Sequence, residues 1–300
     1  MGRSFCGRSA WVDPVVNVLV TGATGFVGRH LVVDLLQRGC RVRAVARSVE
    51  TASTMPWIND VECVAADVHS EALDVAALVD GIDVLAHLAW PGLPNYQELF
   101  HFERNLMADY RFIKTAVNSG VKQVLVTGTC FEYGLQNGLL TEQIDPQPSN
   151  PYALAKNTLR VFLENLQREQ PFVLQWARLF YLYGEGQNPN SLIAALDRAV
   201  DAGEPIFNMS GGEQLRDYLP IETAATYLAG ILHNREFDGI INCCSGQPVS
   251  VRSLVERHIL ARGASIRLNL GYHPYPKHEA MAFWGSAERL LQIVGVDDEA

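Results

Sequence analysis

The sequence predicts an α/β protein whose core is a doubly wound parallel sheet, followed by a smaller C-terminal lobe. Short apolar runs rich in β-branched residues alternate with longer amphipathic segments up to residue 178. These runs are almost continuously apolar, which is typical of parallel strands that helices cover on both faces. A glycine-rich turn follows the first run directly and leads into the first helical segment. Together, these three observations indicate the doubly wound arrangement.

The expected elements follow one another in a regular order. Strands are expected at 17–21, 41–47, 61–65, 82–88, 122–127 and 172–178. Helices are expected between them, near 26–38, 71–80, 96–119 and 152–169. Ligands of such sheets bind beyond the carboxyl ends of the strands, so the residues that follow each strand are the first candidates for function.

Beyond residue 178 the alternation becomes irregular. Loops are expected at 184–190 and 208–220, helices near 191–202, 221–233 and 250–262, and short strands at 238–244 and 266–270. This pattern divides the chain into three parts. They are a flexible leader (1–16), a sheet domain (17–178) onto which about 220–244 packs, and a smaller lobe (179–219 and 245–300). We expect the smaller lobe to close over the ligand.

Composition narrows the class of protein. The 300 residues are 48% apolar and 19% charged, with a net charge of -9. No basic stripe is present for nucleic acid or an anionic membrane, and no apolar run is long enough for a membrane-spanning helix. The leader lacks the apolar core of a signal peptide. The sequence therefore predicts a cytoplasmic protein that binds neither nucleic acid nor membrane.

Cysteine and histidine patterns favour neither disulfides nor a metal. The six cysteines, Cys6 among them, include no CxxC pair, so we expect reduced, buried thiols. His273 and His278 lie in the segment HPYPKH without a third ligand at convincing spacing. We therefore predict no metal site.

The segment 22-GATGFVG-28 has the spacing of a dinucleotide-binding turn. Gly22 permits the tight turn, Gly25 allows close approach of a pyrophosphate, and Gly28 allows the helix to pack on the strand. The N–H groups at the helix N-terminus then face the phosphates. The cofactor contacts expected from this turn are Gly22, Thr24, Gly25, Phe26, Val27 and Gly28.

The next two strand ends bear on the choice of cofactor. The second strand ends at Arg47 and Ser48, where an NAD-binding site usually has an acidic residue. A guanidinium suits a 2′-phosphate, so we expect NADP(H) to be preferred over NAD(H). Asp67, followed by Val68, is placed to accept a hydrogen bond from adenine. The alternative is that Asp67 caps a helix.

The segment 151-PYALAK-156 supplies the candidate acid–base group. Pro151 suits the first turn of a helix, which places Tyr152 and Lys156 on one face at i and i+4. A nearby ammonium favours the phenolate and is expected to lower the pKa of Tyr152. The lysine can also hold a nicotinamide ribose. The fifth strand ends at Thr127 and Thr129, and a hydroxyl there can bond a substrate oxygen together with Tyr152.

At this point the chain resembles the extended short-chain dehydrogenases/reductases, in the NAD-dependent epimerase/dehydratase group that acts on nucleotide sugars. The resemblance covers about residues 17–295. It is carried by the glycine turn, Asp67, 87-HLAW-90, Thr129, Tyr152, Lys156, 178-RLFYLYGEGQNP-189 and 211-GGEQLRDYLP-220. It implies that the sheet domain is a dinucleotide-binding Rossmann domain and that the smaller lobe binds the substrate.

The resemblance implies hydride transfer between the nicotinamide and a sugar carbon, usually C4. Tyr152 then moves the proton, Thr129 orients the sugar oxygen, and Lys156 lowers the pKa of the tyrosine. Asn105 supports the lysine through water. Further cofactor contacts are expected from Leu88, Ala89, Trp90, Asn105 and Thr127, besides Tyr152 and Lys156. Substrate contacts are expected from Trp90, Cys130, Phe131, Tyr181, Asn190 and Arg216, with the arginine on the diphosphate.

Departures from the family pattern narrow the reaction. Cys130 and Phe131 stand where 4,6-dehydratases have Asp and Glu, so elimination of water is not expected. Cys130 is one position away from the cysteine of 3,5-epimerases, and the loop at 180–189 has no histidine. It therefore serves either as a base or, more simply, as a small packing residue. Glu132 either faces the pocket or caps Arg178.

Two further departures suggest a reshaped substrate pocket. Tyr181 replaces an asparagine, and Trp90 replaces a small residue. Aromatic walls suit a deoxy sugar face. We therefore expect an NDP-4-keto-6-deoxyhexose 4-reductase. The alternatives are a C4 epimerase that retains its cofactor and a non-catalytic dinucleotide sensor. The family also implies a homodimer in which the 96–119 and 152–169 helices form a four-helix bundle.

Overall fold

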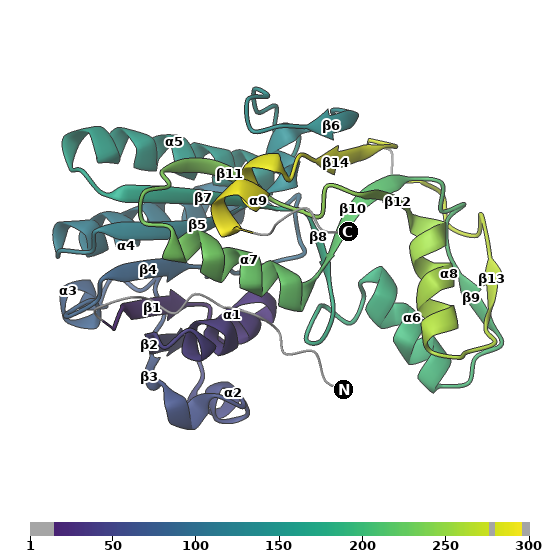
Figure 1. Cartoon of the computed structure of the whole chain (residues 1–300), viewed down its shortest axis with the longest axis horizontal. Coiled ribbons are helices and arrows are strands. Elements are labelled where there is room, and N and C mark those ends of the chain that lie inside the picture. Colours follow the sequence, from purple (N-terminus) through teal and green to yellow (C-terminus); the bar gives the residue numbers. More distant parts are fainter. Residues whose placement is uncertain (1–14, 276–279, 296–300) are drawn as a thin grey trace.

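A seven-stranded parallel sheet forms the centre of the larger lobe in the computed structural model, which describes residues 15–275 and 280–295 (Figure 1). The predicted fold class is confirmed. Most of the leader, with Cys6, and His278 lie outside the described residues. The strands of this sheet are β1 (Asn17–Thr21), β2 (Arg41–Ala46), β3 (Glu62–Ala65), β4 (Val84–His87), β5 (Gln123–Thr129), β7 (Val173–Leu179) and β11 (Gly239–Cys243).

The strand order contains one reversal, and the reversal places the candidate site. The sheet runs β11-β7-β5-β4-β1-β2-β3, with every neighbouring pair parallel. The chain moves outward from β1 to β3 and then returns to β4 on the other side of β1. Thr21 and His87 are therefore partners at the carboxyl ends of β1 and β4. A doubly wound sheet opens its binding crevice at this point.

Helices cover both faces of the sheet, which explains the continuous apolar character of its strands. In β1, Val18 and Val20 are buried in one core cluster and Leu19 in the other. Successive side chains of a strand point to opposite faces, so both must be apolar when both faces are covered. One face is covered by α1 (Phe26–Gln37), α7 (Ile221–His233) and α9 (Glu288–Val294). The other is covered by α3 (Val75–Leu78), α4 (Leu106–Asn118) and α5 (Pro151–Glu169).

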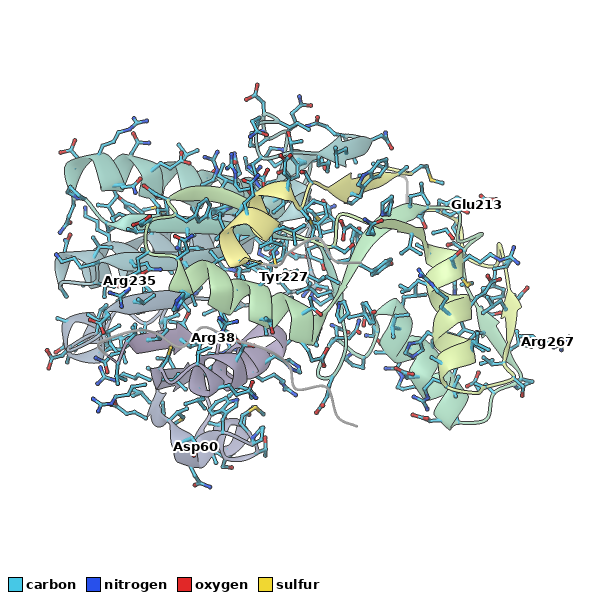
Figure 2. All side chains as sticks on the ribbon, viewed as in Figure 1. Arg38, Asp60, Glu213, Tyr227, Arg235 and Arg267 are labelled. Carbon is cyan, nitrogen blue, oxygen red and sulfur yellow. The ribbon has the colours of Figure 1, made fainter. Side chains whose placement is uncertain are left out.

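The segment 220–244 returns to the large sheet after the chain has entered the smaller lobe. Its strand β11 pairs with β7, and its helix α7 packs against α1. Arg38, labelled beside these two helices in Figure 2, donates to the Thr226 carbonyl at 3.3 Å. Asp34 pairs with Arg38 and accepts from the Thr226 hydroxyl at 2.8 Å. These buried contacts tie α7 to α1.

The smaller lobe lies at one end of the sheet in Figure 1. Its helices α6 (Leu192–Asp201) and α8 (Val251–Ala261) pack around the buried residues Leu196 and Val255. Ser250 begins α8 by accepting from the Ser253 N–H at 3.0 Å. The strands outside the seven-stranded sheet are β6 (Gly138–Leu140), β8 (Tyr181–Tyr183), β9 (Ile206–Asn208), β10 (Leu215–Pro220), β12 (Pro248–Ser250), β13 (Arg267–Asn269) and β14 (Phe283–Gly285).

Some elements differ from the sequence-based expectation. The helix expected at 96–119 begins with a π-helical segment (His101–Asn105) and becomes α-helical only at Leu106. The helix expected at 71–80 is limited to α3, which begins after the cap Asp74. The predicted loop at 208–220 is wrong at its end, because β10 pairs there with β8 and β12. The short helix α2 (Val49–Ser53) was not expected.

The sequence predicts no membrane-spanning helix. Within residues 15–275 and 280–295, the structure has no helix with the length and apolar character needed to cross a bilayer.

Candidate active site

The glycine turn after β1 is folded so tightly that side chains would not fit at two of its positions. Gly22 has a φ of +66°, and a Cβ there would lie 2.9 Å from the Ala89 nitrogen. A Cβ on Gly28 would lie 2.2 Å from the Gly22 carbonyl oxygen. The turn therefore presses on both the first helix and the segment after β4. This is the close packing that a dinucleotide cradle requires.

Thr21 holds the two sides of the cradle together. Its hydroxyl oxygen accepts from the N–H groups of Leu88 and Ala89 at 3.1 and 3.2 Å. Its own proton then goes to His87 Nδ1, 3.0 Å away. His87 Nε2 lies 3.1 Å from the buried carboxylate of Asp109, which also contacts His69 Nε2 at 2.7 Å. The backbone after β4 is thus anchored to β1 and α4.

A cavity of about 540 Å³ opens over the cradle. Most of the cofactor contacts expected from the sequence line it. They are Gly22, Thr24, Gly25, Phe26, Val27, Gly28, Arg47, Asp67, Val68, Leu88, Ala89 and Trp90. Sequence reasoning missed Val45, Ala46, Ala66, His69, Pro91, Gly92, Leu93, Pro94, Tyr96 and Asn188. The cavity and the glycine cradle together fit a dinucleotide.

Two predicted cofactor residues form hydrogen bonds within the protein, and their contacts with a cofactor stay predictions. Ser48 caps α2 by accepting from the Thr51 N–H at 3.0 Å, and it donates to Glu50 Oε2 at 2.8 Å. Asn105 is buried and donates to the Pro91 carbonyl at 2.9 Å, so it braces the segment after β4. Asp67 lines the cavity while accepting from the His69 N–H at 3.0 Å, which makes it the anchor of a turn rather than a helix cap.

Helix α5 brings Tyr152 and Lys156 beside the cavity. Asn150 caps the helix by accepting from the Ala153 N–H at 2.9 Å, and Pro151 occupies its first turn. Lys156 is buried, donates to the Thr127 carbonyl at 2.8 Å, and lies 4.0 Å above the Trp90 ring. Burial lowers the pKa of its ammonium group to about 8.

The phenol of Tyr152 is held in its protonated form. Burial, followed by Tyr96, Glu132 and Cys130, raises its pKa, whereas a side-chain hydrogen bond with Thr129 lowers it. The net direction is upward, so the expected lowering is wrong for the protein in this state. The physical reason is that burial of the phenol, together with the charges of its neighbours, disfavours the phenolate more strongly than the hydrogen bond with Thr129 favours it.

A cluster of aromatic rings surrounds Tyr152. The sequence patterns do not predict this cluster. Its ring lies 5.3 Å from His101, 5.5 Å from Tyr96 and 5.9 Å from Trp90. Trp90 Nε1 donates to His101 Nδ1 at 3.0 Å, so His101 carries its proton on Nε2 and donates it to the Asn95 carbonyl. The relay fixes a neutral histidine, and burial also lowers the pKa of His101.

Aromatic rings continue from Tyr152 into the smaller lobe. Tyr96 packs on Phe131 at 5.3 Å, and Phe131 on Tyr181 at 6.1 Å. Tyr181 contacts Phe283 at 6.0 Å, and the guanidinium of Arg216 lies 4.6 Å above Phe283. Phe131, Tyr181 and Arg216 are thus brought together, as expected. Phe283, which comes from β14, was missed because nothing near it in the sequence marks a site.

Cys130 is buried at the end of β5, and burial raises the pKa of its thiol to about 12. A thiol that holds its proton so firmly is a poor base, which favours the packing role.

Asn190 is exposed, and its N–H donates to the Asn188 side chain at 2.8 Å; Asn188 lines the cavity. In the described part of the chain, no three His, Cys, Asp or Glu residues are grouped to hold a metal.

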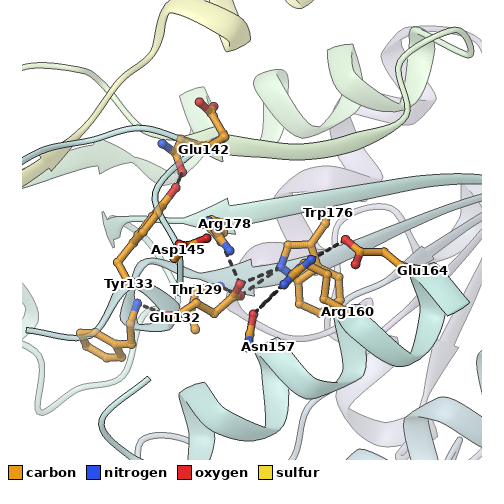
Figure 3. Close-up of polar contacts among 12 residues, drawn as sticks. Thr129, Glu132, Tyr133, Glu142, Asp145, Asn157, Arg160, Glu164, Trp176 and Arg178 are labelled. Atoms are coloured by element: carbon orange, nitrogen blue, oxygen red, sulfur yellow. Dashed lines mark hydrogen bonds and ion pairs between the residues drawn. The ribbon is translucent and has the colours of Figure 1, made fainter. Parts of the chain in front are cut away.

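Glu132 is completely buried and pairs with Arg178, which settles its position. Its Oε2 accepts from Arg178 Nε at 2.8 Å, and Figure 3 shows the carboxylate between Arg178, Trp176 and Thr129. The guanidinium of Arg178 lies 4.4 Å above the Tyr133 ring. Tyr133 in turn donates to Asn242 Oδ1 at 2.7 Å. Tyr133 is therefore a buried anchor and not the acid–base group.

The sheet thus places a dinucleotide cradle next to a buried phenol and ammonium, the arrangement of the extended short-chain dehydrogenases and reductases. The chain matches the model of the NAD dependent epimerase/dehydratase family over residues 18–244. It belongs to this family, and it is an enzyme. The alternative of a non-catalytic dinucleotide sensor is therefore set aside.

Similar proteins carry related names. The chain is 30% identical over 273 residues to dTDP-6-deoxy-L-talose 4-dehydrogenase (NAD(+)) of Aggregatibacter actinomycetemcomitans, covering 90% of this chain and 100% of the relative. It is 24% identical to UDP-glucose 4-epimerase of Halalkalibacterium halodurans, covering 93% and 89%. The solved structure of MoeE5 with UDP-glucuronic acid and NAD superposes with a TM-score of 0.82 at 25% identity, covering 95% and 94%.

Proposed function

We propose that the protein reduces the 4-keto group of a nucleotide-linked 6-deoxyhexose, using a nicotinamide dinucleotide. The observation that carries this proposal is the pairing of a protonated, buried Tyr152 with an aromatic substrate wall. The relative named for a 6-deoxy-L-talose 4-dehydrogenase supports the substrate class and the carbon.

The residues beside the cradle have distinct tasks. The bound dinucleotide supplies the hydride that adds to the ketone carbon. Tyr152 donates its proton to the carbonyl oxygen, which becomes the hydroxyl of the product. Thr129, bonded to the same phenol, orients that oxygen. Lys156 sets the charge beside the phenol and is placed to hold the nicotinamide ribose.

The substrate wall favours a sugar with an apolar edge. Between Tyr152 and Arg216 the chain presents the rings of Tyr96, Phe131 and Tyr181, which offer more apolar surface than hydrogen-bonding groups. A methyl group at C5 of the hexose would pack there, whereas a hydroxymethyl group would lose hydrogen bonds to water. Arg216 lies at the far end, where a guanidinium suits a diphosphate.

The proposal is tested by mixing the purified protein with reduced cofactor and dTDP-, CDP- or GDP-linked 4-keto-6-deoxyhexose. We expect loss of the absorbance of reduced nicotinamide with at least one of the three sugar nucleotides. No oxidation with any of them would refute the proposal.

A C4 epimerase is the second candidate, because relatives named UDP-glucose 4-epimerase share the fold and family. An epimerase uses the same tyrosine in both directions and returns the hydride to the sugar. It therefore consumes no reduced cofactor overall. Interconversion of C4 epimers without net oxidation of NADH would favour this candidate over the reductase.

The cofactor in this proposal is NAD(H). The preference for NADP(H) expected from Arg47 is not supported by the relatives, which are named with NAD. Local contacts point the same way. The Ser48 hydroxyl is engaged by the Thr51 N–H and by Glu50, whose carboxylate would repel a 2′-phosphate. Arg47 lines the cavity but is exposed.

Substitution of Glu50 by glutamine is expected to narrow the difference between the two cofactors. The wild type should use NADH with a higher kcat/KM than NADPH, since the Glu50 carboxylate would repel the 2′-phosphate. E50Q should raise kcat/KM for NADPH and leave that for NADH unchanged. Initial rates with both cofactors measure this, with E103Q, which changes an exposed glutamate of the π-helical segment, as a control. A wild type that prefers NADPH would contradict the NAD(H) assignment.

The protein forms a homodimer through α4 and α5 in this proposal. Met107, Leu154 and Val161 lie on these helices with exposed fractions of 42, 46 and 38%. Apolar side chains on two adjacent helices favour burial against a second copy. Light scattering should give twice the 33.2 kDa of one chain, and a monomeric mass would contradict it.

A further inference from the structure

Glu132 is the residue of 127-TGTCFEYG-134 whose charge has no evident use in hydride transfer. It lies in the short 3-10 turn Cys130–Tyr133 that follows β5, and its carboxylate is completely buried. Burying a carboxylate is costly unless every lone pair finds a donor. The ion pair with Arg178 involves only one of the two carboxylate oxygens, Oε2.

The other oxygen binds the residue that contacts the acid–base phenol. Glu132 Oε1 accepts from the Thr129 backbone N–H at 2.9 Å and from Trp176 Nε1 at 3.0 Å (Figure 3). In return, the Thr129 hydroxyl accepts from the Phe131 N–H at 3.3 Å. This reciprocal pair of bonds is a capping box, which fixes the backbone where the strand turns into the helix. The Thr129 hydroxyl is then left with its proton to donate to Tyr152.

Gly128 shows how closely this contact is built into β5. A Cβ on Gly128 would lie 2.4 Å from Glu132 Oε1 and 2.2 Å from Trp176 Nε1. Only a residue without a side chain lets the carboxylate reach the strand. The neighbour on the other side, Thr127, accepts from Lys156 through its carbonyl. Thr127 therefore binds Lys156, Gly128 leaves room for the Glu132 carboxylate, and Thr129 presents the catalytic hydroxyl.

We propose that Glu132 is a positioning residue that holds the Thr129 main chain so that the Thr129 hydroxyl stays bonded to Tyr152. It acts through Thr129 and touches neither sugar nor cofactor. This inference rests on the catalytic roles given above to Thr129 and Tyr152. It adds a requirement that those roles do not contain, namely a hydrogen-bond acceptor at position 132.

The test must separate this hydrogen bond from the buried ion pair. Removing Glu132 alone leaves the Arg178 guanidinium buried, with its Nη atoms without hydrogen-bond partners among the described residues. Such a change is destabilising whatever the role of Glu132. The comparison is therefore made in the R178M background, between E132Q/R178M and E132M/R178M. The two double variants are similar in size and charge, and glutamine alone can accept from the Thr129 N–H.

We expect E132M/R178M to have a kcat about 10²-fold below that of E132Q/R178M, because small displacements of a catalytic group cost about this much. The KM for reduced cofactor should be the same in both, since Glu132 does not line the cavity. E132Q/R178M should keep a kcat within about threefold of R178M, which is the effect of one neutral hydrogen bond. Trp176→Phe, which removes the indole donor and part of a buried ring, should lower Tm but change kcat by no more than about threefold.

A second readout needs no substrate. Hydrogen exchange of the Thr129 amide should be faster in E132M/R178M than in E132Q/R178M, because only the latter retains its acceptor. Asp34→Asn, which breaks the buried pair with Arg38 on α1, is the control for lost stability, and it should lower Tm without lowering kcat.

Two results overturn the inference: equal kcat in the two double variants, or equal exchange of the Thr129 amide. Failure of the proposed function is a different outcome. In that case the wild type itself turns over none of the sugar nucleotides, and the exchange experiment still decides whether Glu132 holds Thr129.

Discussion

Tyr152→Phe is expected to lower kcat for ketone reduction by about 10³-fold, which lies within the range that a positioned proton donor contributes. The phenol is buried, bonded to Thr129, and held in its protonated form by an environment that raises its pKa. Phenylalanine keeps the ring contacts with Trp90 and Tyr96 and removes only the hydroxyl group. The loss should therefore appear in kcat, with the KM for reduced cofactor unchanged, as measured by initial rates of its oxidation.

Tyr133→Phe is the matched control. Tyr133 is also a buried phenol of this site region, but its hydroxyl donates to Asn242 at 2.7 Å and not to the reacting centre. The variant should lose about 1 kcal/mol of unfolding free energy, the net value of one hydrogen bond, and keep its kcat. Undiminished turnover in Tyr152→Phe would show that another group donates the proton.

The second large effect is expected at Lys156, through its charge. Burial lowers the pKa of its ammonium to about 8, so the positive charge is present below that pH and is lost as the pH rises through it. The rate of ketone reduction should be flat from neutral pH to about 7.5 and should fall above about 8. The titration of Tyr152 does not change the rate in this pH range, because the pKa of its phenol is raised well above the range.

Lys156→Met tests the same charge directly. We expect kcat/KM to fall by about 10²-fold or more, since the variant loses both the ammonium and the group placed to hold the cofactor ribose. Lys122→Met, at an exposed position just before β5, is the control and should behave as wild type. A Lys156→Met variant with the wild-type rate and pH profile would remove Lys156 from the mechanism.

The fold and the centre of the site follow from local sequence patterns. Continuous apolar runs identify the parallel strands, and the glycines at 22, 25 and 28 identify the cradle, because both depend on residues close together in the chain. The spacing of Tyr152 and Lys156 depends on a single helix turn. The strands, the glycine turn and the Tyr152–Lys156 spacing can each be predicted from a few residues that lie close together in the sequence.

What the sequence could not supply depends on contacts between distant segments. Phe283 packs against Tyr181 from β14, and His101 lies against Tyr152 while accepting from the indole of Trp90. The position of Glu132 was left open because it depends on Arg178, 46 residues away, and on the missing side chain of Gly128. The direction of the Tyr152 pKa shift was wrong because burial, which only the packed structure reveals, outweighs the local bonds.

In the proposed function, the protein transfers a hydride to C4 of a nucleotide-linked 4-keto-6-deoxyhexose, with Tyr152 as the proton donor. The most direct test incubates the protein with the ketosugar and NADH in which both hydrogens at nicotinamide C4 are deuterium. Magnetic resonance of the product should show deuterium at sugar C4, with one NADH oxidised for each sugar reduced. A product without deuterium at C4, or a change at C4 with no net oxidation of NADH, would contradict the account.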